Sequence, residues 1–178
     1  LSTAQLAGLT ADHVSDLSAA QLAALSTTGL RALSITAIGG LSATQLGSLS
    51  TSQLTSLTPT QIGALAPSAL SGLSSAELAA LTTTQFSALS TTGIAALSVT
   101  QLASLTTDQI RVLSATALNG LTSTQVASLT TTQLGALAAA QVRSLSPSGL
   151  AGLSATQLDA LSASQFASLD AYQISGLS

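Results

Sequence analysis

Residues 97–104 read LSVTQLAS, and residues 129–136 read LTTTQLGA. The same eight-residue pattern, L-[ST]-x-x-Q-[LIV]-x-x, fills the chain, with leucine at every eighth residue from Leu1 to Leu177. Twenty-two complete octads result, and Leu177 and Ser178 begin another. An uninterrupted short period is typical of a stacked repeat array, in which each repeat packs only on its neighbours.

Positions 2 to 5 of the octad carry the signature of a helix N-terminus. Position 2 is Ser or Thr in all but three octads, and position 5 is Gln in fourteen. A hydroxyl at the N-cap accepts from the backbone N–H three residues later, and the glutamine there accepts from the N-cap N–H in return. Pro59, Pro67 and Pro147 all stand at position 3, the first helical position, where a missing N–H costs least. Each octad is therefore predicted to begin one helix.

The leucine at position 1 and the apolar residue at position 6 flank this start as a hydrophobic staple. Position 6 is apolar in all twenty-two octads, as in Val14, Phe86 and Ile110. A continuous helix does not suit the pattern, because eight residues advance about 800° and would turn successive leucines to all sides. A single strand would place positions 1 and 6 on opposite faces. The chain is therefore expected to bend once per octad.

We predict an all-α repeat solenoid, or superhelix, of short helices of one to two turns, one per octad. Helices this short need neighbours, because helix nucleation is costly, so the two apolar rows are expected to seal between coils. Six octads carry Gly or Ala instead of Gln, and four of these end in Gly. This suggests three or four octads per superhelical turn, with small residues where backbones crowd. The alternative is a three-sided β-solenoid with one octad per face, in which the capping signals would have no role.

The composition indicates how many domains the chain has and which classes of partner it can bind. No linker interrupts the pattern, so residues 1–178 are predicted to be a single continuous array of 22 repeats, an excerpt of a longer chain. Only 5% of the residues are charged, against about a quarter in ordinary domains. So few cations argue against nucleic acid, and no apolar run reaches the length of about 18 residues expected of a transmembrane segment. Low charge also removes the usual protection against self-association, so the expected partner is the chain itself.

The chain offers few residues for chemistry. His13, the single histidine, stands at position 5 with Asp12 and Asp16 nearby, and we interpret it as a substitute for the capping glutamine. One histidine without cysteine cannot form a zinc site, and bases for nucleophilic catalysis are nearly absent. Phe86 and Phe166 stand at position 6 and are assigned to the core. We expect no enzyme activity, no catalytic, cofactor-binding or metal-binding residue, no cofactor and no small-molecule ligand.

The motif of residues 97–104 and 129–136 resembles octapeptide-repeat arrays of very long bacterial surface or secreted proteins that are often described as adhesin-like. The resemblance covers the whole chain and carries over no functional residue. Together with the low charge it implies a structural role, as a repeat segment of an extracellular or cell-surface filament, sheath or stalk that self-assembles. One alternative is the spacer or stalk of a bacterial adhesin. Another is an ice-binding solenoid, suggested by threonine at position 4 in eleven octads.

Overall fold

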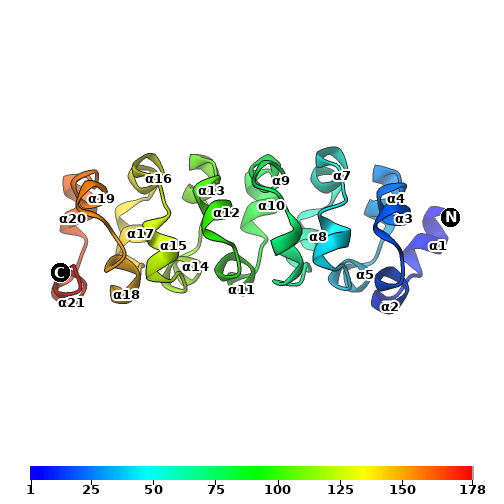
Figure 1. The fold of residues 1–178 in the computed structure, drawn as a ribbon, viewed down its shortest axis with the longest axis horizontal. Coiled ribbons are helices and arrows are strands. Elements are labelled where there is room, and N and C mark those ends of the chain that lie inside the picture. The colour runs from blue at the N-terminus through cyan, green and yellow to red at the C-terminus, as the bar shows by residue number, and fades with distance from the viewer. Residues whose placement is uncertain (178) are drawn as a thin grey trace. The chain divides into compact units, whose positions relative to one another are not determined.

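The computed structural model describes residues 1–177 and contains one short helix for each octad (Figure 1). The chain forms two compact units, Leu1–Ala96 and Leu97–Ser178, although the octad period runs through their boundary without a break. Ser178, in the incomplete last octad, lies outside the described residues. The all-α repeat solenoid is confirmed, and the lack of strands in residues 1–177 argues against the β-solenoid.

The helices are four to six residues long. Those of the first unit are α1 (Thr3–Ala7), α2 (Ala11–Ser15), α3 (Ala19–Ala23), α4 (Thr27–Ala32), α5 (Ile35–Gly39), α6 (Ala43–Leu46), α7 (Thr51–Ser56), α8 (Pro59–Gly63), the 3-10 helix η1 (Ala69–Gly72), α9 (Ser75–Ala80), α10 (Thr83–Ser87) and α11 (Thr91–Ala95). Those of the second unit are α12 (Val99–Ala103), α13 (Thr107–Arg111), α14 (Ala115–Asn119), α15 (Ser123–Ala127), α16 (Thr131–Ala136), α17 (Ala139–Arg143), α18 (Pro147–Leu150), α19 (Ala155–Asp159), α20 (Ala163–Ala167) and α21 (Ala171–Ser175).

The helices start as the capping signals predict. In α1, the N-cap hydroxyl of Ser2 accepts from the Gln5 N–H at 3.3 Å, and the Ser2 N–H donates to Gln5 Oε1 at 2.8 Å. Asp170 replaces the hydroxyl at the N-cap of α21 and accepts from the Gln173 N–H at 2.8 Å. Proline is the first helical residue of α8 and of α18. Local sequence is therefore sufficient to place the start of these helices.

The link between successive helices includes two extended residues, the leucine and the N-cap residue, where both are described, as in the link from α7 to α8. Leu57, after α7, has φ −63° and ψ 145°, and the following N-cap, Thr58, has φ −71° and ψ 156°. No glycine or other described residue has a positive φ. The glycines at position 8 therefore do not act as left-handed C-caps. The leucine and the N-cap residue together make the bend that was predicted once per octad.

Each coil of the solenoid contains three octads. In the first unit α1 contacts α4, α2 contacts α5 and α4 contacts α7, and in the second unit α13 contacts α16 and α15 contacts α18. Contacts thus join helices that are three apart in the chain. Three octads of eight residues, or 24 residues, therefore make one turn, which lies within the predicted three or four octads.

The two apolar rows form the core, as predicted. Position 6 is only 0–3% exposed in the first nineteen octads, and the position-1 leucines are buried from Leu33 to Leu145. Each fully buried large apolar side chain contributes about 1.5–3 kcal/mol, so these rows supply the main driving force for folding. Phe86 is 1% exposed, but Phe166 is 47% exposed. The assignment of Phe166 to the core was wrong, because among the described helices α20 packs on α17 and its phenylalanine stays half exposed on the other side.

Glycine at position 8 allows the backbones of successive coils to approach closely. A Cβ added to Gly40 would lie 2.6 Å from the carbonyl oxygen of Ala11, and one added to Gly72 would overlap the carbonyl of Ala43. Both glycines end octads that lack glutamine at position 5. The prediction that small residues mark crowded backbone is confirmed at these positions, where only glycine fits without displacing a neighbour.

The octad of residues 65–72 departs from the α-helical pattern. It lacks both halves of the capping box, since Ala66 stands at position 2 and Ala69 at position 5, and it forms η1 without a side-chain cap. Ala138 also lacks a hydroxyl, yet its N–H donates to Gln141 Oε1 at 2.8 Å and α17 remains α-helical. Loss of both halves thus coincides with the tighter 3-10 turn, which has poorer hydrogen-bond geometry.

We predict that Ala66→Ser stabilises the protein by about 1 kcal/mol, the typical contribution of an N-cap hydroxyl. The new hydroxyl would accept from the Ala69 N–H, which now donates to the Ala66 carbonyl at 2.9 Å. Urea unfolding followed by circular dichroism measures the change. Ala76→Ser, at an exposed position inside α9, is the matched control and should not stabilise. Equal stabilisation by both variants would show that capping is not the cause.

Candidate functional site

His13 takes the capping role that its position predicts. Its Nδ1 accepts from the Thr10 N–H at 3.2 Å, and its own backbone N–H donates to Thr10 Oγ1 at 3.3 Å. Asp12 and Asp16 are exposed, and residues 1–177 contain no group of three metal-ligating side chains. His13 is therefore a local substitute for glutamine in α2.

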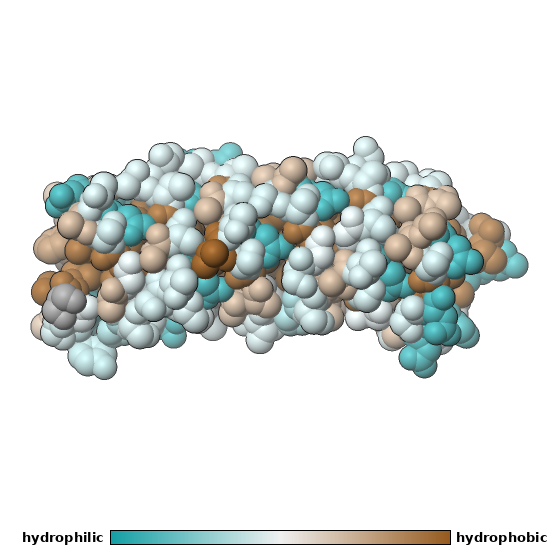
Figure 2. All heavy atoms as spheres, viewed as in Figure 1, coloured by the Kyte–Doolittle hydropathy of each residue, from teal (hydrophilic) through white to brown (hydrophobic). Residues whose placement is uncertain are grey.

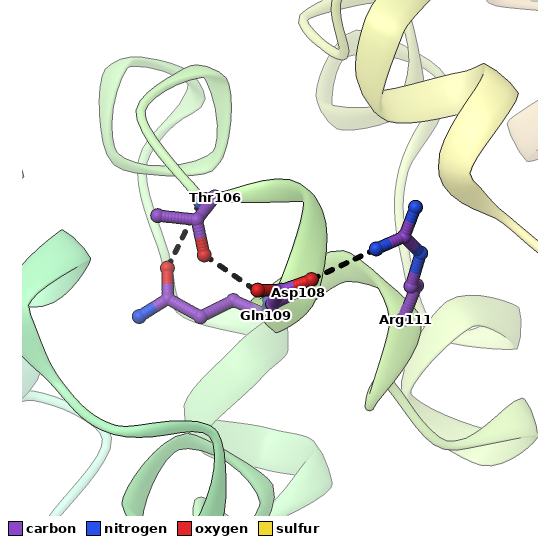
Figure 3. Close-up of polar contacts among 4 residues, drawn as sticks. All are labelled: Thr106, Asp108, Gln109 and Arg111. Carbon is purple, nitrogen blue, oxygen red and sulfur yellow. Dashed lines mark hydrogen bonds and ion pairs between the residues drawn. The ribbon is translucent and has the colours of Figure 1, made fainter.

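The charged side chains are few and lie at the surface. Arg111 Nη1 contacts Asp108 Oδ1 at 2.8 Å across one turn of α13, and the two side chains are 59% and 70% exposed (Figure 3). On the same helix the Thr106 N–H donates to Gln109 Oε1 at 3.0 Å (Figure 3). An exposed ion pair contributes at most about 1 kcal/mol, so this pair is a local contact and not a binding site.

An open groove of about 330 Å³ in the second unit is lined by Ala115, Thr116, Asn119 and Ser144. None of these side chains is ionisable, whereas ligand pockets enclose most of the ligand and place a few polar groups around it. The face drawn in Figure 2 is mostly pale, with small brown and teal areas between the weakly polar residues. The groove therefore does not define a small-molecule site. No helix in the described part of the chain is long and apolar enough to cross a membrane.

The most constrained polar groups are the buried glutamines at position 5, for which the sequence predicted only a local role. Eleven of them are buried, with exposed fractions of 1–8%. Gln61 shows how one side chain bonds in two directions. Its Oε1 accepts from the Thr58 N–H at 2.9 Å, and its Nε2 donates to the Leu33 carbonyl at 2.9 Å and to the Leu30 carbonyl at 3.2 Å. The amide oxygen thus caps its own helix, while the amide nitrogen binds the preceding coil.

This donation repeats at a fixed register, and we call it the glutamine ladder. Within the two units, ten glutamines donate from Nε2 to the leucine carbonyl 28 residues earlier, at 2.6–2.9 Å. Each of these leucines lies in the extended link between two helices, so its carbonyl accepts no backbone hydrogen bond from either helix. Several also donate to the last turn of a helix in the preceding coil, as Gln45 does to the Val14 carbonyl at 2.7 Å. No buried polar side-chain atom of the described residues lacks a partner.

The first coil presents one half of the ladder without its counterpart. Gln5 and Gln21 are exposed, and both bind their own N-caps, but neither Nε2 has an acceptor among the described residues. His13 is also exposed, and because its Nδ1 accepts from Thr10, neutral His13 carries its hydrogen on Nε2. Leu1 is 79% exposed.

The last coil presents the other half. Phe166 and Ile174 are 47% and 46% exposed, although position 6 is buried in the first nineteen octads. The carbonyls of Leu153, Leu161 and Leu169 accept no hydrogen bond from the described residues, whereas the Leu145 carbonyl of the preceding coil accepts from a glutamine at 2.8 Å.

No known protein family, curated protein or solved structure matches this chain. The similarity to octapeptide-repeat surface proteins therefore stays a prediction. Interpretation of function has to come from the glutamine ladder and the small charge.

We predict that Gln61→Glu destabilises the protein by about 2 kcal/mol or more, because a buried carboxylate cannot donate and would face carbonyl oxygens. Gln21→Glu is the matched control at the same octad position. Its capping box persists, since glutamate serves there as well, and its Nε2 has no acceptor among the described residues, so stability should hardly change. Chemical unfolding of both variants gives the comparison. Similar losses in the two would show that the ladder contributes nothing beyond capping.

Glu77 stands where most octads have glutamine, so the reverse substitution, Glu77→Gln, can be tested there. It accepts from the Ser74 N–H at 2.8 Å as a glutamine would, but it cannot donate to the preceding coil. By the 28-residue register its counterpart would be the carbonyl of Leu49. We predict that Glu77→Gln stabilises the protein by about 1 kcal/mol, the usual net contribution of one hydrogen bond. Thermal unfolding should show a higher midpoint for Glu77→Gln than for the parent chain. Ala76→Gln adds the same amide at an exposed position and should leave the midpoint unchanged.

Proposed function

We propose that this chain is a structural protein, a repeat segment of an extracellular or cell-surface filament, sheath or stalk that associates with itself. The glutamine ladder is the observation that carries the proposal. Its buried amides all hold one coil to another at one register. A protein whose buried polar groups serve only its own regular stacking is suited to a mechanical role.

The surface composition supports contact between copies. The formal net charge is −3 over 178 residues, so copies repel each other only weakly. Exposed positions carry mainly Ser, Thr and Ala, whose short side chains lose little conformational entropy when they are covered. Self-association is therefore favoured over recognition of a strongly charged partner.

The absence of cysteine and methionine supports a location outside the cell. The chain contains neither residue, so it has no thiol or thioether that oxidants would convert. This resistance suits an extracellular fibre or stalk. If the chain does not self-associate, the same architecture would instead suit the spacer of an adhesin.

Ice binding is a second candidate, favoured by a row of threonines in the first unit. Thr36, Thr60 and Thr84 are exposed at the same octad position and follow one another at intervals of 24 residues, one per coil. Asp12 takes this position one coil earlier. Helices pack about 8–10 Å apart, so this row is sparse compared with one built on neighbouring strands.

Electron microscopy and light scattering of the purified chain at rising concentration test the structural role. We expect uniform filaments or bundles whose mass grows with concentration. Monodisperse single chains at every concentration would contradict self-association. Thermal hysteresis measured on the same samples tests the second candidate, and a concentrated solution without hysteresis would eliminate ice binding.

A further inference from the structure

We propose that Asn119 is a site of hydrolytic deamidation in the folded chain, where opening of the last turn of α14 controls the rate. The reaction converts the side-chain amide to a carboxylate and releases ammonia. Asn119 ends α14, is followed by Gly120 and is the single asparagine of a chain that also lacks cysteine and methionine. This site is independent of the proposed self-association.

The reaction needs only the two residues and water. The backbone nitrogen of Gly120 attacks the side-chain carbonyl carbon of Asn119, so a new C–N bond closes a five-membered succinimide ring. The bond to the amide nitrogen breaks, and this nitrogen takes up the Gly120 proton through solvent and leaves as ammonia. Water then adds to one of the two ring carbonyls, one C–N bond breaks, and the product is aspartate or isoaspartate. Glycine favours the first step, because no Cβ crowds the attacking nitrogen.

The Asn119 side chain is accessible to water. Asn119 and Gly120 are both exposed, and the side-chain amide of Asn119 has no hydrogen-bond partner among the described residues. Asn119 also lines the open groove of about 330 Å³, together with Ala115, Thr116 and Ser144. The groove admits water to the amide and leaves room for the ring that forms.

The backbone of the closed helix prevents the attack. Gly120 caps α14 with φ −78° and ψ −7°, and its N–H donates to the Thr116 carbonyl at 3.2 Å. While this hydrogen bond is intact, the Gly120 nitrogen faces the preceding turn and cannot approach the Asn119 side chain. Ring closure therefore requires that the last turn of α14 opens.

Such an opening is accessible because α14 is short and only half capped. The helix has five residues, and helices of this length have little stability of their own. Ser114 accepts from the Ala117 N–H at 3.1 Å, but alanine replaces the glutamine that would complete the capping box. The atoms nearest to a Cβ added at Gly120 are carbonyl oxygens of its own helix, at 3.5 and 3.6 Å, which is ordinary contact. Exposed segments of this kind open at low free energy, so the fold slows the reaction without abolishing it.

Deamidation would alter a packed segment next to the site. Leu121 follows Gly120 and is 2% exposed, and its carbonyl oxygen would lie 3.3 Å from a Cβ added to Gly149 in the next coil. Isoaspartate adds one backbone carbon before Gly120 and so displaces this segment. Either product also adds a negative charge at the C-terminal end of α14, where the helix dipole disfavours an anion. Conversion is therefore expected to lower the thermal unfolding midpoint.

Peptide mass spectrometry measures the reaction. The purified chain is incubated at mildly alkaline pH, both folded and unfolded in urea, and the peptide that contains Asn119 is examined for the change from amide to acid and for isoaspartate. We expect conversion in both samples. It should be at least about tenfold slower in the folded chain, which corresponds to an opening free energy of about 1.4 kcal/mol.

Three variants separate the chemistry from the opening of the helix. Asn119→Gln keeps an amide but would have to close a six-membered ring, so conversion should be far slower in both samples. Ser114→Ala should speed conversion about fivefold in the folded chain, the factor that corresponds to an N-cap hydroxyl of about 1 kcal/mol, and should have no effect in urea. Ser26→Ala is the matched control, because it removes the same hydroxyl from α4, whose octad also lacks glutamine. It should leave the rate at Asn119 unchanged.

Four results would contradict the proposal. A folded chain that stays intact at Asn119 while the urea sample converts would overturn it. Equal rates in the two samples, or equal rates in Ser114→Ala and Ser26→Ala, would show that opening of α14 does not control the reaction. A midpoint unchanged after full conversion would contradict the effect on the packed segment. None of these results depends on self-association, which electron microscopy and light scattering test separately.

Discussion

The side-chain amide at position 5 holds two backbone segments together, and the rest of each unit depends on it. Its oxygen satisfies the N-cap of one helix and its nitrogen satisfies a leucine carbonyl 28 residues earlier, as in Gln85 with Thr82 and Leu57. A buried carbonyl without a partner costs about 1–3 kcal/mol, so the donor stabilises each extended bend that it reaches. The ladder therefore makes it possible to bury a backbone that is neither helix nor sheet.

Octads without glutamine show a second way to pack coils. Gly72 brings its backbone against Ala43, in an octad where Ala69 replaces glutamine, and Gly40 does the same against Ala11 after Ala37. A Cβ at either point would meet the neighbouring backbone at under 3 Å, so the small residues at positions 5 and 8 of these two octads allow one close approach. Van der Waals contact between backbones takes the place of the amide bridge there.

The contact between coils covers the same groups at the same register in the inner coils, and these groups are exposed where no neighbouring coil is described. In the inner coils position 6 is almost fully covered, whereas Phe166 and Ile174 are not. The Nε2 atoms of Gln5 and Gln21 are free although those of Gln45 and Gln53 bind the coil before them. Stability in such an array is approximately a sum of neighbour terms, so each coil is stabilised mainly by the coils beside it.

The sequence by itself determined the short helices and, outside residues 65–72, their starting points, because capping boxes, prolines at position 3 and the two apolar rows are all local signals within eight residues. In residues 65–72 the 3-10 helix begins at Ala69 and not at Pro67. It also assigned His13 to a capping role, from its position alone. Only the tertiary structure decided that three octads close one coil, that Phe166 is exposed and that the glutamines reach the preceding coil. These features depend on contacts between residues about 28 apart, and the octad is the same whichever coil lies beside it. A local repeat can specify each element but not which distant element meets it.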